Sequence, residues 1–135
     1  MATGTSLQSR FGLLGAILGF LGVALGAFGT HALAGSLPAA RLATFETAVR
    51  YQLIHAVALV ALSAVARRAP TRALALAGLM MALGALIFCG SLYLLVLLDQ
   101  PALGAVTPLG GVCFLVGWMS LAAHYLALRR MPVRG

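Results

Sequence analysis

Residues 11–33 have the sequence FGLLGAILGFLGVALGAFGTHAL, an apolar run that contains no arginine and no acidic residue. An α-helix of about 20 apolar residues crosses the roughly 30 Å hydrocarbon layer at 1.5 Å per residue. Three further runs of similar character follow at 47–66, 73–98 and 108–128. None alternates like a barrel strand. The sequence therefore predicts an all-α, polytopic membrane protein, a four-transmembrane-helix bundle that forms a single transmembrane domain over residues 1–135.

The composition of the whole chain agrees with this fold class. The chain is 62% hydrophobic and 8% charged, with a mean hydropathy of +1.06, whereas a soluble domain has about 25% charged residues. The net charge of +7 does not indicate nucleic acid, because the arginines lie singly or in pairs beside apolar runs. The expected partner is the lipid bilayer, with no nucleic acid.

The arginines predict how the helices are oriented. An even number of crossings places both termini on the side of the 67–72 loop, which carries Arg10, Arg67, Arg68, Arg72, Arg129, Arg130 and Arg134. The other side has Arg41 and Arg50, together with Glu46 and Asp99. The positive-inside rule therefore predicts that both termini are cytoplasmic. The first run is longer than the core of a signal peptide, about 7–15 residues, so we expect it to be retained.

Small residues predict how the helices pack. Those of the first run follow one another at spacings of 3, 4, 3, 4 and 3, and are Gly12, Gly15, Gly19, Gly22, Gly26 and Gly29. The fourth run has a similar seam, made of Gly110, Cys113, Gly117, Ser120 and His124. Such stripes let helix backbones approach closely in lipid. We expect the first and fourth helices to form the closest contact, with a homodimer as the alternative, and both cysteines to serve packing.

Helix ends follow from capping residues. Ser36 before Leu37 and Pro38 predicts that the second helix runs over 37–66, with 47–66 in the membrane. Thr107 before Pro108 gives the same signal for the fourth helix.

Polar residues at membrane depth are the candidate functional residues, because they are costly there. At 100° per residue, Tyr51, Gln52 and His55 share one helix face. The predicted pocket lies in the outer half of the membrane and consists of His31, Tyr51, Gln52, His55, Ser91 and Tyr93. Glu46 and Arg50 lie on another face, at the i, i+4 spacing of a candidate ion pair.

Each of these features also has a structural interpretation. His55 is a neutral, hydrogen-bonded imidazole or a group that handles a ligand or proton, and the residues alone leave both open. The Glu46–Arg50 pair is more often structural. His124 seals the seam or faces the interface, and Trp118 and Tyr125 resemble packing or interfacial anchors. The sequence shows no catalytic constellation, so we expect no enzyme, no metal and no cofactor. Haem between His31 and His55 is a minor alternative.

Four ordered motifs resemble a known family: GAFGTHAL at 26–33, TFETAVRYQLIHA at 44–56, FCGSLY at 88–93, and TPLGG at 107–111 with Gly117 and Trp118. They are similar to the small YgdD/YwdK membrane proteins, which in turn are similar to transmembrane protein 256 and are of unknown function. The resemblance implies a four-helix protein of the bacterial inner membrane. Its matching positions are His31, Glu46, Arg50, Tyr51, Gln52, His55, Ser91 and Tyr93. It implies no biochemical activity.

Two functions therefore stay open at this point. The first is a small scaffold or accessory subunit of a membrane complex, which the size of the chain favours. The second is a binding or transport module whose outer pocket holds a small solute, a lipid headgroup or a proton.

Overall fold

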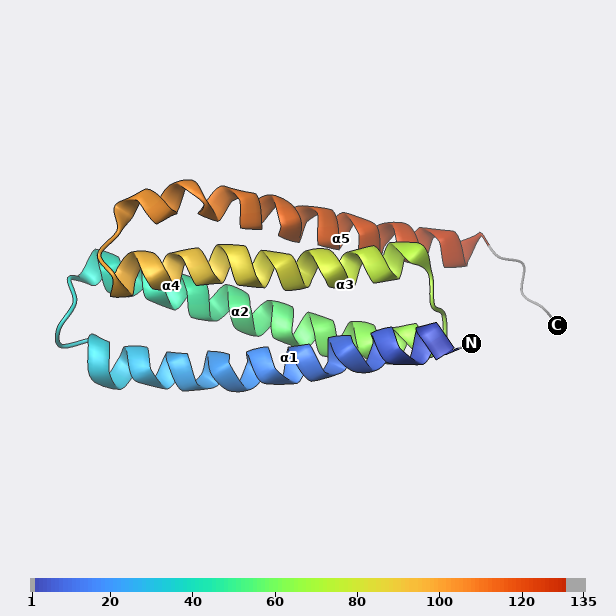
Figure 1. Cartoon of the computed structure of the whole chain (residues 1–135), viewed down its shortest axis with the longest axis horizontal. Coiled ribbons are helices and arrows are strands. Elements are labelled where there is room, and N and C mark those ends of the chain that lie inside the picture. Colours follow the sequence, from blue (N-terminus) through green and yellow to red (C-terminus); the bar gives the residue numbers. More distant parts are fainter. Residues whose placement is uncertain (1, 131–135) are drawn as a thin grey trace.

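The structure, a computed structural model, describes residues 2–130, and every secondary-structure element in that range is a helix. Four stretches are long and apolar enough to cross a membrane: Ser9–Leu33, Ala39–Ala66, Arg72–Leu97 and Pro101–Arg129. They run alternately up and down. The first begins and the last ends at one end of the molecule, beside the 67–71 connection (Figure 1). The four predicted helices are thus confirmed, with ends that differ from the prediction.

The first span lies within α1 (Ala2–Phe28) and a π-helical turn, η1 (Gly29–Leu33), and it begins at Ser9 rather than at the predicted residue 11. The second is α2 (Ala39–Ala66), which has Pro38 at its N-cap. Ser36 is not a cap for this helix. Its hydroxyl donates instead to the carbonyls of Ala32 and Leu33, at 3.3 Å each, so that it closes the end of the preceding helix.

The third span is divided by a second π-helical turn that the sequence did not predict. It consists of α3 (Arg72–Gly84), η2 (Ala85–Cys89) and α4 (Gly90–Leu97). The short 3-10 helix η3 (Pro101–Ala105) then leads into α5 (Thr107–Arg129), whose N-cap is Val106 rather than the predicted Thr107. A π turn inserts an extra residue and so changes the face that the following helix presents. The face of α4 is therefore rotated relative to that of α3.

The order of packing differs from the predicted one. The most extensive contacts join α1 to α2 and α3 to α5, and α2 then packs on α3, η2 and α4. In the most apolar stretch of each span, the buried share is 17% in the first and 22% in the fourth, against 33% and 39% in the second and third. The first and fourth spans are thus peripheral, on opposite sides of a central pair (Figure 1). The expectation that they make the closest contact was wrong.

The glycine stripe of α1 faces α2. A Cβ atom on Gly15 would lie 2.7 Å from the Ala56 carbonyl oxygen, and one on Gly22 would lie 2.7 Å from a Leu53 methyl carbon. The remaining stripe glycines face α2 as well: Gly12 meets Ser63, Gly19 meets Ala56, Gly26 meets Val49 and Gly29 meets Phe45. The two helices are therefore antiparallel, in a register that brings Gly19 level with Ala56.

The glycines of α5 face the third span instead of α1. A Cβ atom on Gly117 would lie 2.9 Å from the Met81 side chain, and one on Gly110 would overlap the backbone of Phe88 in η2. The prediction that the small residues of α5 face the first helix was wrong. Glycine spacing identifies the small-residue face of one helix, but it does not identify the helix that packs on that face.

Two apolar clusters fill the centre. The first is made of Phe11, Leu59, Leu62, Ala66, Leu74, Ala77 and Met81. The second is made of Ala48, Ala85, Cys89, Leu92 and Phe114. Cys89 is buried in this second cluster, and neither it nor Cys113 forms a disulfide.

Candidate functional site

His55 lies between α2 and α5, with 3% of its surface exposed. Its Nε2 accepts a hydrogen bond from the indole N–H of Trp118 at 3.1 Å. Indole nitrogen is only a donor, so Nδ1 carries the imidazole proton and donates it to the Tyr51 carbonyl at 2.7 Å. The ring stacks on Phe114, with centroids 3.5 Å apart and planes inclined by 12°. Both nitrogens of the neutral imidazole are thus hydrogen-bonded: the Nδ1 bond lies within α2, and the Nε2 bond joins α2 to α5.

Gln52, one residue from Tyr51, joins three helices. Its side-chain amide donates to the Leu18 carbonyl of α1 at 2.9 Å, and its carbonyl oxygen accepts from the Tyr93 hydroxyl of α4 at 2.8 Å. Gln52 is 4% exposed, and Tyr93 also packs its ring against Phe45, with centroids 5.0 Å apart. This bond network connects α1, α2 and α4 across the centre of the molecule.

Ser91 and Tyr51 of the predicted pocket also contact residues outside it. The Ser91 hydroxyl bonds the Thr107 hydroxyl at 2.7 Å and lies 3.0 Å from the Phe88 carbonyl, so it ties α4 to the start of α5. The Tyr51 ring is 40% exposed, stacks with the His55 ring at 6.2 Å between centroids, and packs on Phe88 at 4.7 Å. The structure thus brings together two pairs of the predicted pocket residues, Tyr51 with His55 and Gln52 with Tyr93.

The structure does not bring His31 into this group. His31 is exposed on η1, beyond the level at which Gly29 meets Phe45, whereas His55 lies level with Gly19. The twelve residues from Gly19 to His31 correspond to roughly 18 Å along the helix. His31 and His55 therefore cannot ligate one haem iron. Among residues 2–130, no group of three or more His, Cys, Asp or Glu side chains could hold a metal ion.

The ion pair in the described part of the chain is not the predicted one. Glu46 and Arg50 are both exposed and make no ion pair with each other. Arg41 instead pairs with Asp99 at 3.1 Å and also donates to the Val96 carbonyl. Asp99 has a φ of +54°, a left-handed conformation that aspartate tolerates better than most residues. The pair joins the start of α2 to the turn after α4.

His124 is fully buried at the opposite end of the molecule. Its Nδ1 lies 2.7 Å from the Thr71 hydroxyl, and that oxygen also accepts from the backbone N–H of Leu74 as the N-cap of α3. Its Nε2 has no hydrogen-bonding partner within residues 2–130. His124 therefore seals the contact between α5 and α3, in line with one of its two sequence interpretations.

Sequence reasoning missed the partners of His55 and of Arg41. Trp118 was interpreted as a packing or interfacial anchor, yet it supplies the hydrogen bond to His55. One signal was present: the indole N–H of a tryptophan at membrane depth needs an acceptor, and few acceptors exist there.

We expect Gln52→Leu to lower the free energy of unfolding by about 1–2 kcal/mol, because it removes two interhelical bonds and leaves the Tyr93 hydroxyl without a partner. Tyr93→Phe should cost about 0.6 kcal/mol, since the bond from Gln52 to Leu18 persists. The double variant should cost less than the sum, because neither partner is then left unpaired. Thermal unfolding in detergent measures all three. Strictly additive losses would show that the two side chains do not interact.

The chain is similar to one family of membrane proteins. The family described as protein of unknown function (DUF423) matches residues 25–111. The UPF0382 membrane protein YwdK of Bacillus subtilis (strain 168) is 40% identical over 120 residues, which cover 86% of this chain and 98% of the relative. The UPF0382 inner membrane protein YgdD of Escherichia coli (strain K12) is 38% identical over 128 residues, or 94% of this chain and 98% of the relative. No solved structure matches.

These relatives agree with the resemblance that the four motifs suggested, and they are named as membrane or inner membrane proteins. Nothing in their names or in the family description assigns an activity. The chain belongs to the DUF423 family of membrane proteins of unknown function.

Proposed function

We propose that the protein is a small scaffold or accessory subunit of a larger membrane complex and that it is not an enzyme. The observation that carries the proposal is the state of its buried polar groups. His55 has both ring nitrogens bonded, Gln52 bridges three helices, and Ser91 is bonded to Thr107. Residues that could perform chemistry are thereby engaged in fixing helix positions.

The outer surfaces of α1 and α5 support a role in assembly. Both are peripheral, and each exposes large apolar side chains, with Phe20 74% exposed on α1 and Met119 73% exposed on α5. These two faces point away from each other, so one can contact a partner helix while the other contacts lipid. A second copy of the chain is one such partner.

Site-specific photo-crosslinking in the native membrane tests this proposal. A benzophenone amino acid is placed in turn at Phe20, at Met119 and at Leu86, which is 71% exposed on η2 and serves as a third membrane-facing position. We expect one face to give a protein adduct of defined mass and the other positions to give lipid adducts. An adduct of twice the monomer mass identifies a homo-oligomer. Lipid adducts alone at all three positions would contradict the scaffold function.

We further propose that both termini lie in the cytoplasm. The seven arginines near the termini and the 67–72 loop, against two at the other end, support this orientation. A reporter fused after residue 135 or inserted in the 67–72 loop should report cytoplasm, and one in the 99–106 loop should report the opposite side. A C-terminal fusion that is active only outside the cytoplasm would reverse the assignment.

A further inference from the structure

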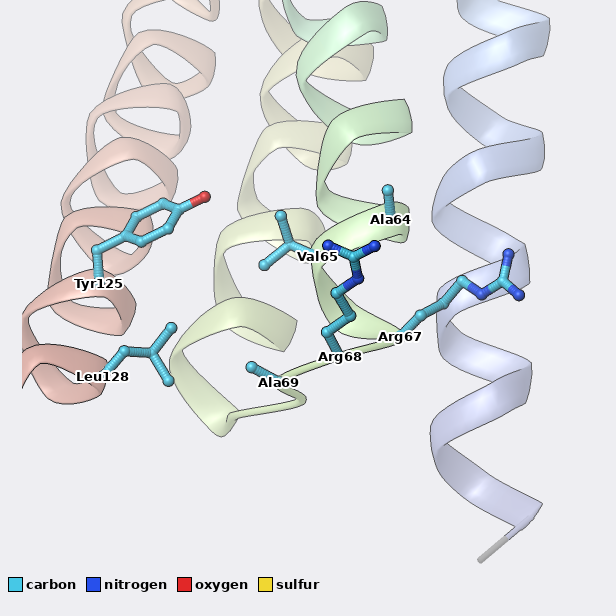
Figure 2. Close-up of a pocket in the computed structure, with 7 residues that line it drawn as sticks. All are labelled: Ala64, Val65, Arg67, Arg68, Ala69, Tyr125 and Leu128. Carbon is cyan, nitrogen blue, oxygen red and sulfur yellow. The ribbon is translucent and has the colours of Figure 1, made fainter. Parts of the chain in front are cut away.

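A large groove opens at the arginine-rich end, between α2 and α5. Its volume is about 790 Å³, and it is lined by Ala64, Val65, Arg67, Arg68, Ala69, Tyr125 and Leu128. Figure 2 shows the Arg68 side chain running back along α2, with the Tyr125 hydroxyl directed from α5 toward the same space. Arg67 extends instead toward α1 (Figure 2). The groove thus has apolar walls and a polar, cationic rim.

The rim carries positive charge that nothing in the described residues neutralises. Arg67 and Arg68 are exposed, and neither has an ion pair or a side-chain hydrogen bond within residues 2–130. The sequence has two acidic side chains, and both belong to the opposite end: Glu46 near the start of α2 and Asp99 after α4. The potential at the groove is therefore positive, and its ligand must supply the negative charge.

The depth of the groove in the membrane indicates which class of ligand it can bind. Arg67 and Arg68 directly follow the last residue of the second candidate span, so we place them at the level of the lipid phosphates. Ala64 and Val65 are the preceding residues of α2 and extend the groove toward the hydrocarbon. A free anion would use only the rim. A molecule with an anionic head and an apolar chain would use both the rim and the walls.

We infer that this groove binds an anionic phospholipid, with its phosphate at Arg68 and Tyr125 and the start of an acyl chain against Val65 and Leu128. Basic pockets between transmembrane helices on the cytoplasmic side are suited to such headgroups, and the groove lies on that side in the orientation proposed above. The site is separate from the outer polar residues and does not depend on the proposed scaffold function, because lipid can occupy it whether or not a partner protein binds elsewhere.

Native mass spectrometry of the full chain in mixed micelles tests the inference, with phosphatidylglycerol and phosphatidylcholine of matched chains in competition. We expect the wild type to prefer phosphatidylglycerol. Arg68→Gln should lower that preference about fivefold, the effect of one arginine near a lipid surface. The matched control is Arg130→Gln, which removes the same charge from the same end but outside the groove.

A second variant tests the walls of the groove without changing charge. Val65→Trp fills the space beside Arg68 and should also lower phosphatidylglycerol binding, and a cooperative melting transition in phosphatidylcholine mixed micelles checks that the variant is folded. If Arg68→Gln and Arg130→Gln reduce the preference equally, general charge attraction replaces the groove site. If inorganic phosphate competes as well as the lipid does, the site belongs to a soluble anion, and the inference is overturned.

Discussion

Gly110→Ala is expected to be strongly destabilising, by about 3 kcal/mol or more, with a fall in melting temperature of roughly 10 °C. The added Cβ would overlap the backbone nitrogen and Cα of Phe88, atoms that belong to the π turn η2 and cannot rotate away as a side chain can. The α5 helix must therefore move off the third span. Thermal unfolding in detergent, monitored by circular dichroism, measures the loss.

Gly111→Ala provides a matched control in the same helix turn. A Cβ at Gly111 would lie 3.9 Å and 4.0 Å from atoms of the Phe88 ring, which is ordinary van der Waals contact. Alanine is also a better helix former than glycine by about 1 kcal/mol. We expect Gly111→Ala to be neutral or slightly stabilising. Equal losses in the two variants would mean that α5 does not pack on η2 in the membrane.

His55→Ala is expected to lower the free energy of unfolding by about 2–4 kcal/mol. The change removes the ring stacked on Phe114, opens a cavity between α2 and α5, and leaves the indole N–H of Trp118 without its acceptor. Trp118 is the single tryptophan of the chain, so its fluorescence reports this contact directly. We expect a shift of its emission in the folded variant, together with a lower melting temperature.

Two further variants test the interpretation of His55. Trp118→Phe should cost about 1 kcal/mol, and the pair should be non-additive because one bond is lost in both single variants. Glu46→Ala should have almost no effect, since Glu46 is exposed and has no ion pair within residues 2–130. If His55→Ala keeps wild-type stability and instead abolishes a response to an added ligand, the imidazole serves a pocket and the scaffold interpretation fails.

The membrane fold could be predicted because it follows from composition and from local patterns. Helix length, the positions of the four spans and the small-residue face of α1 all depend on residues close in sequence. The partner of that face does not, because Gly15 meets Ala56 and Val60 only after the whole chain is arranged. The π turn at Ala85–Cys89 was missed for a similar reason, since its residues are ordinary helix formers and the packing around Phe88 supports it.

For the polar residues too, the helix face could be predicted from the sequence, but the partners on other helices could not. Helical periodicity placed Gln52 and His55 together, and both are buried, as polar residues at membrane depth should be. Their partners are on distant helices and could not be read from spacing. The i, i+4 rule favoured Glu46 with Arg50, but a surface pair of this kind contributes only about 0.3–0.5 kcal/mol. Arg41 reaches Asp99 instead because the turn after α4 brings that carboxylate to it.

The pairing of α1 with α2 and of α3 with α5 has a consequence for how the protein enters the membrane. The first and second spans form one hairpin, and the third and fourth spans form another. Each hairpin has its own close glycine contacts, so each can close as soon as its second span has been inserted. The bonds from His55 to Trp118, from Gln52 to Tyr93 and from Arg41 to Asp99 all cross from one hairpin to the other. These three contacts can therefore form only when the two halves dock, after each hairpin has closed.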